Sequence, residues 1–270
     1  MSYRRRPDCR GCGNRDLVEF LQLGPTPLAN AFLRDLSEAE DEESYPLDLF
    51  FCPRCSLVQI LDIVSPEVLF SDYIYVTGTS ETIAEHNRAY ARSLVEGEGL
   101  DRDALVVEVA SNDGSLLRAF QPHGVRTLGV EPATNIAEMA RAAGVETVNE
   151  FFDADRGAEV REAYGPARVV IGNNVFAHVD EPADFLVGVR RLLADGGLSS
   201  IEVPYLGDLL ERREFDTVYH EHLSYFSVTA LMHLYGEAGL AIERVLPVSV
   251  HGGSIRILAR PAQNGEGHGE

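Results

Sequence analysis

The chain has 270 residues, of which 45% are hydrophobic, and it carries a formal net charge of −20. This length suits one large domain or a medium domain with a small one, and the apolar content is enough for a substantial core, which argues against a disordered chain. The acidic charge disfavours a nucleic-acid partner, no apolar run reaches the roughly 18 residues of a membrane span, and the first seven residues lack an apolar signal segment. We therefore expect a cytoplasmic protein, either a monomer or a weak oligomer, without nucleic-acid or membrane partners.

Two Cys-x-x-Cys pairs occur early in the chain, the first at Cys9 and Cys12 and the second at Cys52 and Cys55. Each pair suits a tight turn that presents two thiolates, and the two turns together complete a tetrahedral metal site. Disulfide bonds are the competing interpretation, which the expected cytoplasmic location disfavours. Since four protein ligands leave no open coordination position, we predict that the site holds a structural Zn2+ ion.

The segment between the two cysteine pairs predicts a small sheet. Residues 21–33 begin as a strand and become a Pro-rich turn, and residues 35–43 form an acidic, solvated loop. Residues 45–51 predict a strand that enters the second cysteine turn, and residues 57–63 predict the strand that leaves it. We assign residues 1–64 to a zinc-binding domain whose metal supplies much of its folding free energy.

Residues 65–100 predict a mostly helical connector that begins at the Ser-Pro-Glu sequence of residues 65–67. A polar and aromatic break interrupts it over residues 73–80. This break is either a loop between two helices or a lid over a bound ligand, and the sequence leaves both interpretations open.

Short strands and helices alternate regularly over residues 101–262, which predicts a parallel sheet covered by helices on both faces. The expected strands are Leu105–Val109, Thr127–Val130, Glu146–Val148, Val169–Gly172, Leu198–Val203, Ile242–Val245 and Ser254–Leu258. The expected helices are Ser115–Gln121, Ile136–Ala143, Ala158–Tyr164, Phe185–Leu193 and Val228–Ala238. Residues 263–270 read as a flexible polar tail.

The stretch from Leu105 to Gly114 reads as a buried strand, a tight polar turn and the start of a helix. Such a corner presents free backbone N–H groups at a helix N-terminus and commonly binds nucleotides. This turn, however, has one glycine and no lysine, and Glu108 lies near the end of its strand. An acidic turn repels a pyrophosphate and suits a ligand with hydroxyls and a positive charge, such as S-adenosylmethionine (SAM).

Other polar residues also follow predicted strands. Glu131 ends the second strand, where an acidic side chain accepts hydrogen bonds from ribose hydroxyls. Asn173 and Asn174 end another strand, and His178 follows them. Because the carboxyl ends of parallel strands meet at one edge of a sheet, we expect these side chains to share one nucleotide site.

The densest polar run of the chain reads Tyr-His-Glu-His-Leu-Ser-Tyr over residues 219–225. It has three interpretations: a metal site at His220 and His222, a general-base cluster, or a helix-entry loop with satisfied polar groups. Further on, His251 lies in a glycine turn before the last predicted strand, where it is a turn residue or a substrate contact.

Together these motifs resemble the zinc-containing SAM-dependent sugar C-methyltransferases of antibiotic deoxysugar biosynthesis. The resemblance rests on the two cysteine pairs followed by Glu-Val-Ala-Ser-Asn-Asp-Gly, Gly-Val-Glu-Pro-Ala, Asn-Asn-Val-Phe-Ala-His, Glu-Val-Pro-Tyr, Tyr-His-Glu-His and His-Gly-Gly-Ser-Ile-Arg. It implies a Rossmann-like class I SAM methyltransferase with a doubly wound α/β sheet. It also implies a nucleotide-linked (dTDP) 4-keto-6-deoxysugar substrate, methylated at carbon 3 through an enolate.

The resemblance also assigns site residues. It makes His222 the base, places Tyr219 and Glu221 beside it, and adds His178 and either Tyr73 or Tyr75 to the same site. The residues expected to hold SAM are Glu108, Ala110, Asn112, Gly114, Glu131, Pro132, Asn173 and Asn174, with Gly78 and Ser80 in a covering loop. Family members are longer and carry a further C-terminal domain, most of which this chain lacks. Methylation of oxygen or nitrogen on another small molecule, and a non-catalytic role beside a partner enzyme, are the alternative functions.

Overall fold

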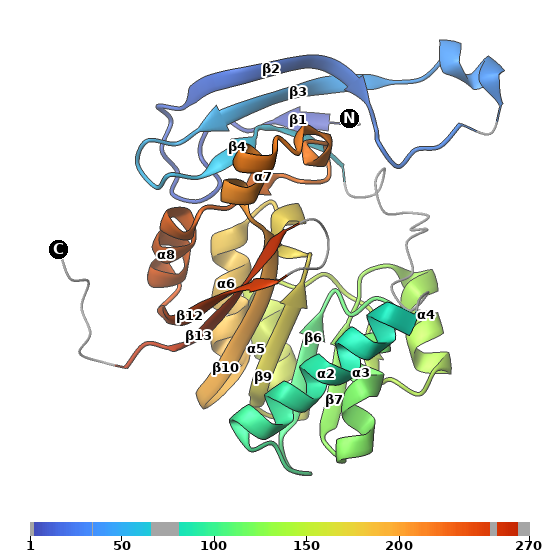
Figure 1. The fold of residues 1–270 in the computed structure, drawn as a ribbon, viewed down its shortest axis with the longest axis vertical. Coiled ribbons are helices and arrows are strands. Elements are labelled where there is room, and N and C mark those ends of the chain that lie inside the picture. The colour runs from blue at the N-terminus through green and yellow to red at the C-terminus, as the bar shows by residue number, and fades with distance from the viewer. Residues whose placement is uncertain (1–2, 34, 66–80, 249–252, 264–270) are drawn as a thin grey trace.

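A computed structural model describes residues 3–33, 35–65, 81–248 and 253–263 (Figure 1). The predicted site residues Tyr73, Tyr75, Gly78, Ser80 and His251 lie outside these ranges. Among the described helices, none is both long enough and apolar enough to cross a membrane.

A seven-stranded sheet forms the centre of the molecule, with the strand order β12-β13-β10-β9-β6-β7-β8 (Figure 1). Neighbouring strands from β10 to β8 pair in parallel. All five residues of β6 are buried, as expected for a strand covered on both faces. The strand bounds are β6 (Leu105–Val109), β7 (Arg126–Val130), β8 (Thr147–Val148), β9 (Ala167–Asn173), β10 (Leu193–Pro204), β12 (Leu240–Val248) and β13 (Ser254–Pro261).

The expectation of a wholly parallel sheet is wrong at one edge. β13 runs antiparallel to both β10 and β12. Only a short segment separates the end of β12 at Val248 from the start of β13 at Ser254. A parallel pair needs a crossover of a dozen or more residues, so these two strands can pair only as a hairpin. The predicted α/β class is confirmed, with a mixed sheet.

Helices cover both faces of this sheet. Apolar residues of α2 and α3 pack on one face together with Val106 and Ile171. Residues of α5, α6 and α8 pack on the other face, together with Val107 and Val109. The helix bounds are α2 (Glu81–Glu98), α3 (Ser115–Phe120), α4 (Thr134–Ala142), α5 (Ala154–Tyr164), α6 (Pro182–Leu192), α7 (Leu206–Arg212) and α8 (Val228–Glu237). Short 3-10 helices occur at η1 (Leu36–Glu40), η3 (Gln121–His123), η4 (Phe176–His178) and η5 (Phe215–Thr217).

The N-terminal part contributes most of a second, four-stranded sheet with the order β11-β4-β3-β2, and it forms a small ribbon of β1 and β5. The strand bounds are β1 (Tyr3–Arg5), β2 (Val18–Pro27), β3 (Ser44–Phe51), β4 (Val58–Ile60), β5 (Asp62–Val64) and β11 (Ser224–Tyr225). β11 comes from the C-terminal half of the chain and pairs antiparallel with β4.

Three local expectations for this region need correction. β2 continues through the predicted Pro-rich turn to Pro27, because an edge strand tolerates proline. Residues 57–63 form two short strands in different sheets, β4 and β5, instead of one. The acidic loop contains η1, which Asp35 caps by accepting a hydrogen bond from the Ser37 N–H.

Candidate active site

A cavity of about 690 Å3 lies where the carboxyl ends of β6, β7 and β9 meet residues of β1 and β5. Its acidic lining includes Glu108, Glu131 and Glu221. The lining residues that the sequence assigned to SAM are Glu108, Ala110, Asn112, Glu131, Pro132, Asn173 and Asn174. The residues predicted to bind SAM, which follow three separate strands, therefore line one cavity.

Gly114 is placed differently, because it is not among the lining residues. It caps the N-terminus of α3 with φ of 72°. A Cβ at this position would lie 2.8 Å from Cγ2 of Val145. Glycine therefore permits the left-handed turn before α3 and the close approach of this turn to Val145. The turn places the residues just before Gly114 at the cavity.

Glu131 organises the turn after β6. Its two carboxylate oxygens accept hydrogen bonds from the backbone N–H groups of Asn112 and Ala133, each at 2.9 Å. Burial raises the pKa of Glu131, and these two hydrogen bonds oppose that effect. Each carboxylate oxygen keeps a second lone pair, so the side chain can still accept from hydroxyls in the cavity.

Glu108 is a buried carboxyl group that lacks a hydrogen-bond partner for one of its oxygens among the described residues. Its side chain lines the cavity, and its Oε2 has no hydrogen-bond partner among the described residues. Burial raises its pKa well above the usual value, and the nearby charges of Asp113 and Glu131 raise it further. A cationic ligand in the cavity would relieve this cost by pairing with the carboxylate.

The turns at this edge have unusual backbone conformations. Ala110, Asn112 and Asn174 all have positive φ values, of 53°, 50° and 55°. A left-handed conformation at a residue with a Cβ costs about 1–3 kcal/mol and persists where the surroundings enforce it. This strain is concentrated at the ends of β6 and β9, which is typical of a ligand-binding edge.

His222 is held in a defined tautomer. Its Nδ1 lies 3.0 Å from the carbonyl oxygen of Thr217, and its Nε2 lies 3.0 Å from the hydroxyl of Tyr219. A carbonyl only accepts hydrogen bonds, so we infer that Nδ1 carries the proton and that Nε2 is unprotonated and accepts from the Tyr219 hydroxyl. Burial lowers the pKa of His222 to about 4, so the ring is neutral at pH 7.

His178 lines the cavity and neighbours His222. Its ring centroid is 4.9 Å from that of His222. Burial and the nearby His222 lower its pKa to about 3. His222 and Tyr219 are not among the lining residues of the described chain, so the structure brings the predicted base close to the cavity through His178.

The remaining residues of the polar run serve separate contacts. Glu221 lines the cavity and accepts a hydrogen bond of 2.6 Å from Asn30. His220 lies 3.1 Å from the carbonyl oxygen of Tyr45. His220 and His222 thus bind different backbone carbonyls. Within the described ranges, only the four cysteines form a group of metal-ligand side chains, so this run has no metal site there.

The four cysteines do converge. The ligand atoms of Cys9, Cys12, Cys52 and Cys55 all lie within 4.8 Å of one another, and none is in a disulfide. The closest Sγ pairs are 3.5 Å and 3.6 Å apart, near the roughly 3.8 Å expected between thiolates that share one Zn2+ at about 2.3 Å. The sulfur set and its spacing fit zinc.

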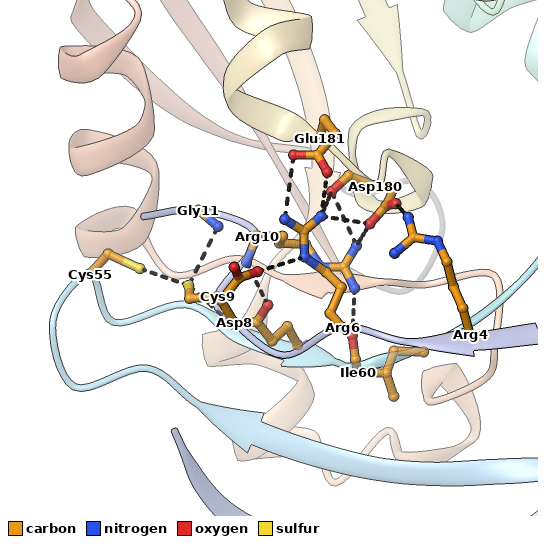
Figure 2. A network of polar contacts seen from close by, with 11 residues as sticks. Arg4, Arg6, Asp8, Cys9, Arg10, Gly11, Cys55, Ile60, Asp180 and Glu181 are labelled. Carbon is orange, nitrogen blue, oxygen red and sulfur yellow. Dashed lines mark hydrogen bonds and ion pairs between the residues drawn. The ribbon is translucent and has the colours of Figure 1, made fainter. Parts of the chain in front are cut away.

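Other groups support the cysteine cluster. The Cys9 sulfur accepts hydrogen bonds from the Gln59 side chain and the Gly11 N–H, at 3.1 Å and 3.4 Å (Figure 2 shows the second). The hydrogen bond with Cys55 lowers the pKa of the Cys9 thiol, with a further contribution from Gln59, against the opposing effect of burial. Such contacts orient the ligand sulfurs and favour the thiolate form.

Comparison with known families assigns both parts of the chain. Residues 9–70 match a model described as a zinc binding domain, and residues 83–245 match one described as a methyltransferase domain. The second match covers more than half of the chain. This chain belongs to the methyltransferase family. Relatives of this methyltransferase include the C-methyltransferase NovU of Streptomyces niveus, which is 42% identical over 255 residues.

That match covers 94% of the methyltransferase described here and 61% of NovU, so the chain spans about three fifths of the length of that curated relative. Solved structures show the same fold. The SAM-dependent methyltransferase of Anabaena variabilis has a TM-score of 0.53 at 15% identity, with 72% of this chain and 91% of that chain covered. The magnesium protoporphyrin IX methyltransferase of Synechocystis, solved with bound SAH, has a TM-score of 0.51 at 14% identity, with 73% and 92% covered.

The residues of this methyltransferase fit SAM. The uncompensated Glu108 suits the positive charge of the cofactor, and Glu131 suits its ribose hydroxyls. The structure adds lining residues that sequence reasoning missed, namely Tyr3, Arg4, Glu150, Phe151 and Phe152. The last three follow the predicted third strand as an acidic and aromatic sequence, a signal that could have identified them.

Replacing Glu131 by glutamine should raise the Kd for SAM about 10- to 100-fold, since a charge-assisted hydrogen bond contributes about 1.5–3 kcal/mol. Glutamine offers one acceptor oxygen where the carboxylate serves two backbone N–H groups, so the turn is weakened as well. Isothermal titration with SAM measures the change. Glu146→Gln, at an exposed position beside β8, is the matched control and should leave the Kd unchanged.

The two histidines also predict a pH dependence of stability. Their pKa values of about 3 and about 4 lie below the ordinary 6.5, so the unfolded chain binds more protons than the folded chain between pH 4 and 6.5. The stabilisation is therefore full above pH 6.5 and is lost as the pH falls toward 4. Urea unfolding between pH 4.5 and 7.5 should show a smaller pH dependence in His222→Gln than in the parent. Equal pH dependence in both would contradict the neutral, buried state of His222.

Proposed function

We propose that the protein transfers the methyl group of SAM to carbon 3 of a nucleotide-linked (dTDP) 4-keto-6-deoxysugar. The proposal is supported by the methyltransferase family, by the similarity to the C-methyltransferase NovU and by the neutral histidine pair beside the cavity. The observation that carries it is the fixed tautomer of His222, which leaves Nε2 unprotonated and able to accept a proton. Transfer to carbon needs such a base, because the acceptor carbon has to lose a proton.

The proposed reaction makes use of this geometry. A carbon next to a ketone is acidic enough for a positioned base to remove its proton, which leaves an enolate. In our proposal His222 accepts that proton at Nε2, and its Nδ1–H stays bonded to the Thr217 carbonyl. SAM bound in the cavity would supply the methyl group, which its positively charged sulfur activates toward attack by the enolate carbon. The C–C bond would form as the C–S bond breaks, with the neutral thioether S-adenosylhomocysteine as the leaving group.

Tyr219 lies on the side of His222 from which the proton would arrive. Its hydroxyl occupies the Nε2 lone pair, so the phenol has either to yield that position or to pass the proton on. Tyr219→Phe separates these two roles. Turnover is retained if the phenol only yields its position, and it is lost if the phenol carries the proton.

Two measurements test the function. The first is formation of a methylated product from SAM and a dTDP-4-keto-6-deoxysugar. The second is exchange of the proton at carbon 3 with solvent deuterium, with and without SAM. Methylation of another acceptor at oxygen or nitrogen, with no exchange at the sugar carbon, would exclude the proposal. Complex formation with another enzyme and no turnover on any sugar nucleotide would favour a non-catalytic role.

A further inference from the structure

Three arginines near the N-terminus converge on one carboxylate at the cavity. Arg4, Arg6 and Arg10 all contact Asp180, with the Oδ1 atom 3.0 Å from Arg6 and 2.9 Å from Arg10 (Figure 2). Arg6 also contacts Glu181 at 2.5 Å. These residues are about 170 positions apart in the sequence, so the ion pairs join the N-terminal unit to the methyltransferase part.

Arg10 is the buried member of this group. Its side chain has 0% exposure, whereas that of Arg4 is 58% exposed. Its guanidinium also donates to the carbonyl oxygen of Ile60 at 2.5 Å. A buried guanidinium is costly unless it is paired, so the contacts to Asp180 and Ile60 fix its position.

The place of Arg10 in the chain connects it to the metal site. It is the residue after Cys9 in the first Cys-x-x-Cys turn. Its backbone N–H donates to the Gln59 side chain at 3.0 Å, and the same side chain donates to the Cys9 sulfur at 3.1 Å. The backbone of Arg10 is therefore held by the same group that holds a zinc ligand.

Asp180 lies two residues after His178, which ends η4. On the other side of His178, the carbonyl oxygen of Ala177 accepts a hydrogen bond of 2.8 Å from the N–H of Leu223, the neighbour of His222. The segment that carries His178 is thus held at one end beside His222 and at the other end by Arg10, together with Arg4 and Arg6. These two attachments flank the imidazole ring that lies 4.9 Å from that of His222.

We propose that Arg10 is a positioning residue, which couples the zinc site through Asp180 to the placement of His178 against His222. The proposal rests on the proposed function for the role of the histidine pair. Arginine is required because one planar group bonds Asp180 and the Ile60 carbonyl in two directions. A lysine ammonium is a single point charge and does not reproduce this geometry.

The test compares Arg10→Gln with Arg54→Gln. Arg54 lies inside the second Cys-x-x-Cys turn, but it is exposed and has no ion pair with a described residue, so it is a matched control. Arg10→Gln should keep the parent's zinc content and its Kd for SAM within about twofold. Its kcat for sugar methylation should fall about 10- to 100-fold with KM nearly unchanged, because a misplacement of about 1 Å costs on that order. Unchanged kcat in zinc-loaded Arg10→Gln would overturn the proposal.

Asp180→Asn provides the second variant, because it leaves the cysteine turn intact. It should show a defect in kcat at least as large, because Asp180 also pairs with Arg4 and Arg6. The double variant should be no worse than Asp180→Asn alone. Parent-like kcat in Asp180→Asn overturns the coupling, even if Arg10→Gln loses zinc or fails to fold.

Amide hydrogen exchange gives a readout that does not depend on turnover. Peptides that cover residues 176–181 should exchange faster in Arg10→Gln and Asp180→Asn, with no change in Arg54→Gln. Exchange as slow as in the parent in both Arg10→Gln and Asp180→Asn overturns the proposal. If the parent enzyme fails to methylate the sugar, the proposed function fails, and the exchange data still decide whether Arg10 holds this segment.

Discussion

His222→Ala should reduce methyl transfer to the ketosugar by about 100- to 10,000-fold, the range expected for the loss of a general base. The Kd for SAM should stay within about twofold of the parent value, because His222 is not among the described residues that line the cavity. Proton exchange at carbon 3 should be lost together with methylation, since both need the same deprotonation. Single-turnover methylation and isothermal titration with SAM measure the two quantities.

His123 offers a control for this variant, because it is exposed in η3 and is not among the described residues that line the cavity. His123→Ala should match the parent in both measurements. A large loss of SAM affinity in His222→Ala would instead assign His222 to cofactor binding. Methylation without carbon-3 exchange in this variant would indicate a base elsewhere in the site.

The second large effect is expected on removal of zinc. Structural zinc sites contribute about 10–16 kcal/mol of apparent binding free energy in zinc-finger peptides, and that energy supports folding. Here Cys9, Cys52 and Cys55 belong to the same apolar cluster as Val107 and Phe226 of the methyltransferase part. Cys52→Ser should therefore lose the metal and lower the unfolding temperature of the whole chain by 10 °C or more, roughly the effect of a few kcal/mol in a chain of this length.

Metal analysis and scanning calorimetry check this expectation. Ser56→Ala, one residue beyond the second cysteine pair, changes a neighbouring side chain without removing a ligand and serves as the control. If Cys52→Ser loses its zinc but unfolds at the parent temperature, the metal does not support the common core. A disulfide in the place of the metal would be revealed by the absence of free thiols in the denatured parent.

Local patterns were sufficient for much of the fold and for the convergence of the strand-end residues on one cavity. The strand Leu105–Val109 was predicted correctly because four of its five residues are apolar and a polar turn follows it. The convergence of Glu108, Glu131 and Asn173 followed from one property of parallel sheets, that their carboxyl ends meet at one edge. The four cysteines were recognisable because a tetrahedral ion imposes their spacing.

Features that depend on contacts between distant segments were beyond such reasoning. The pairing of Ser224–Tyr225 with β4 could not be predicted, because a strand of two residues is too short to show an alternating sequence pattern. The ion pairs of Arg4, Arg6 and Arg10 could not be inferred, because charged N-terminal residues look the same whether solvated or paired. The antiparallel edge was missed because the prediction extended the strand–helix alternation to β12 and β13, which have no helix between them.

The pairing of β11 with β4 has a consequence for how the protein is made. The N-terminal sheet needs Ser224 and Tyr225 for its last strand, and the Ile60 N–H donates to the Leu223 carbonyl. On the ribosome, β4 emerges about 10 to 30 s before these residues at typical elongation rates of about 5–20 residues per second. During that interval the cysteines can already hold their metal, while one edge of the nascent sheet has no strand beside it. Zinc bound during synthesis would therefore stabilise the N-terminal sheet while the edge of β4 is unpaired, until β11 has been synthesised and pairs with it.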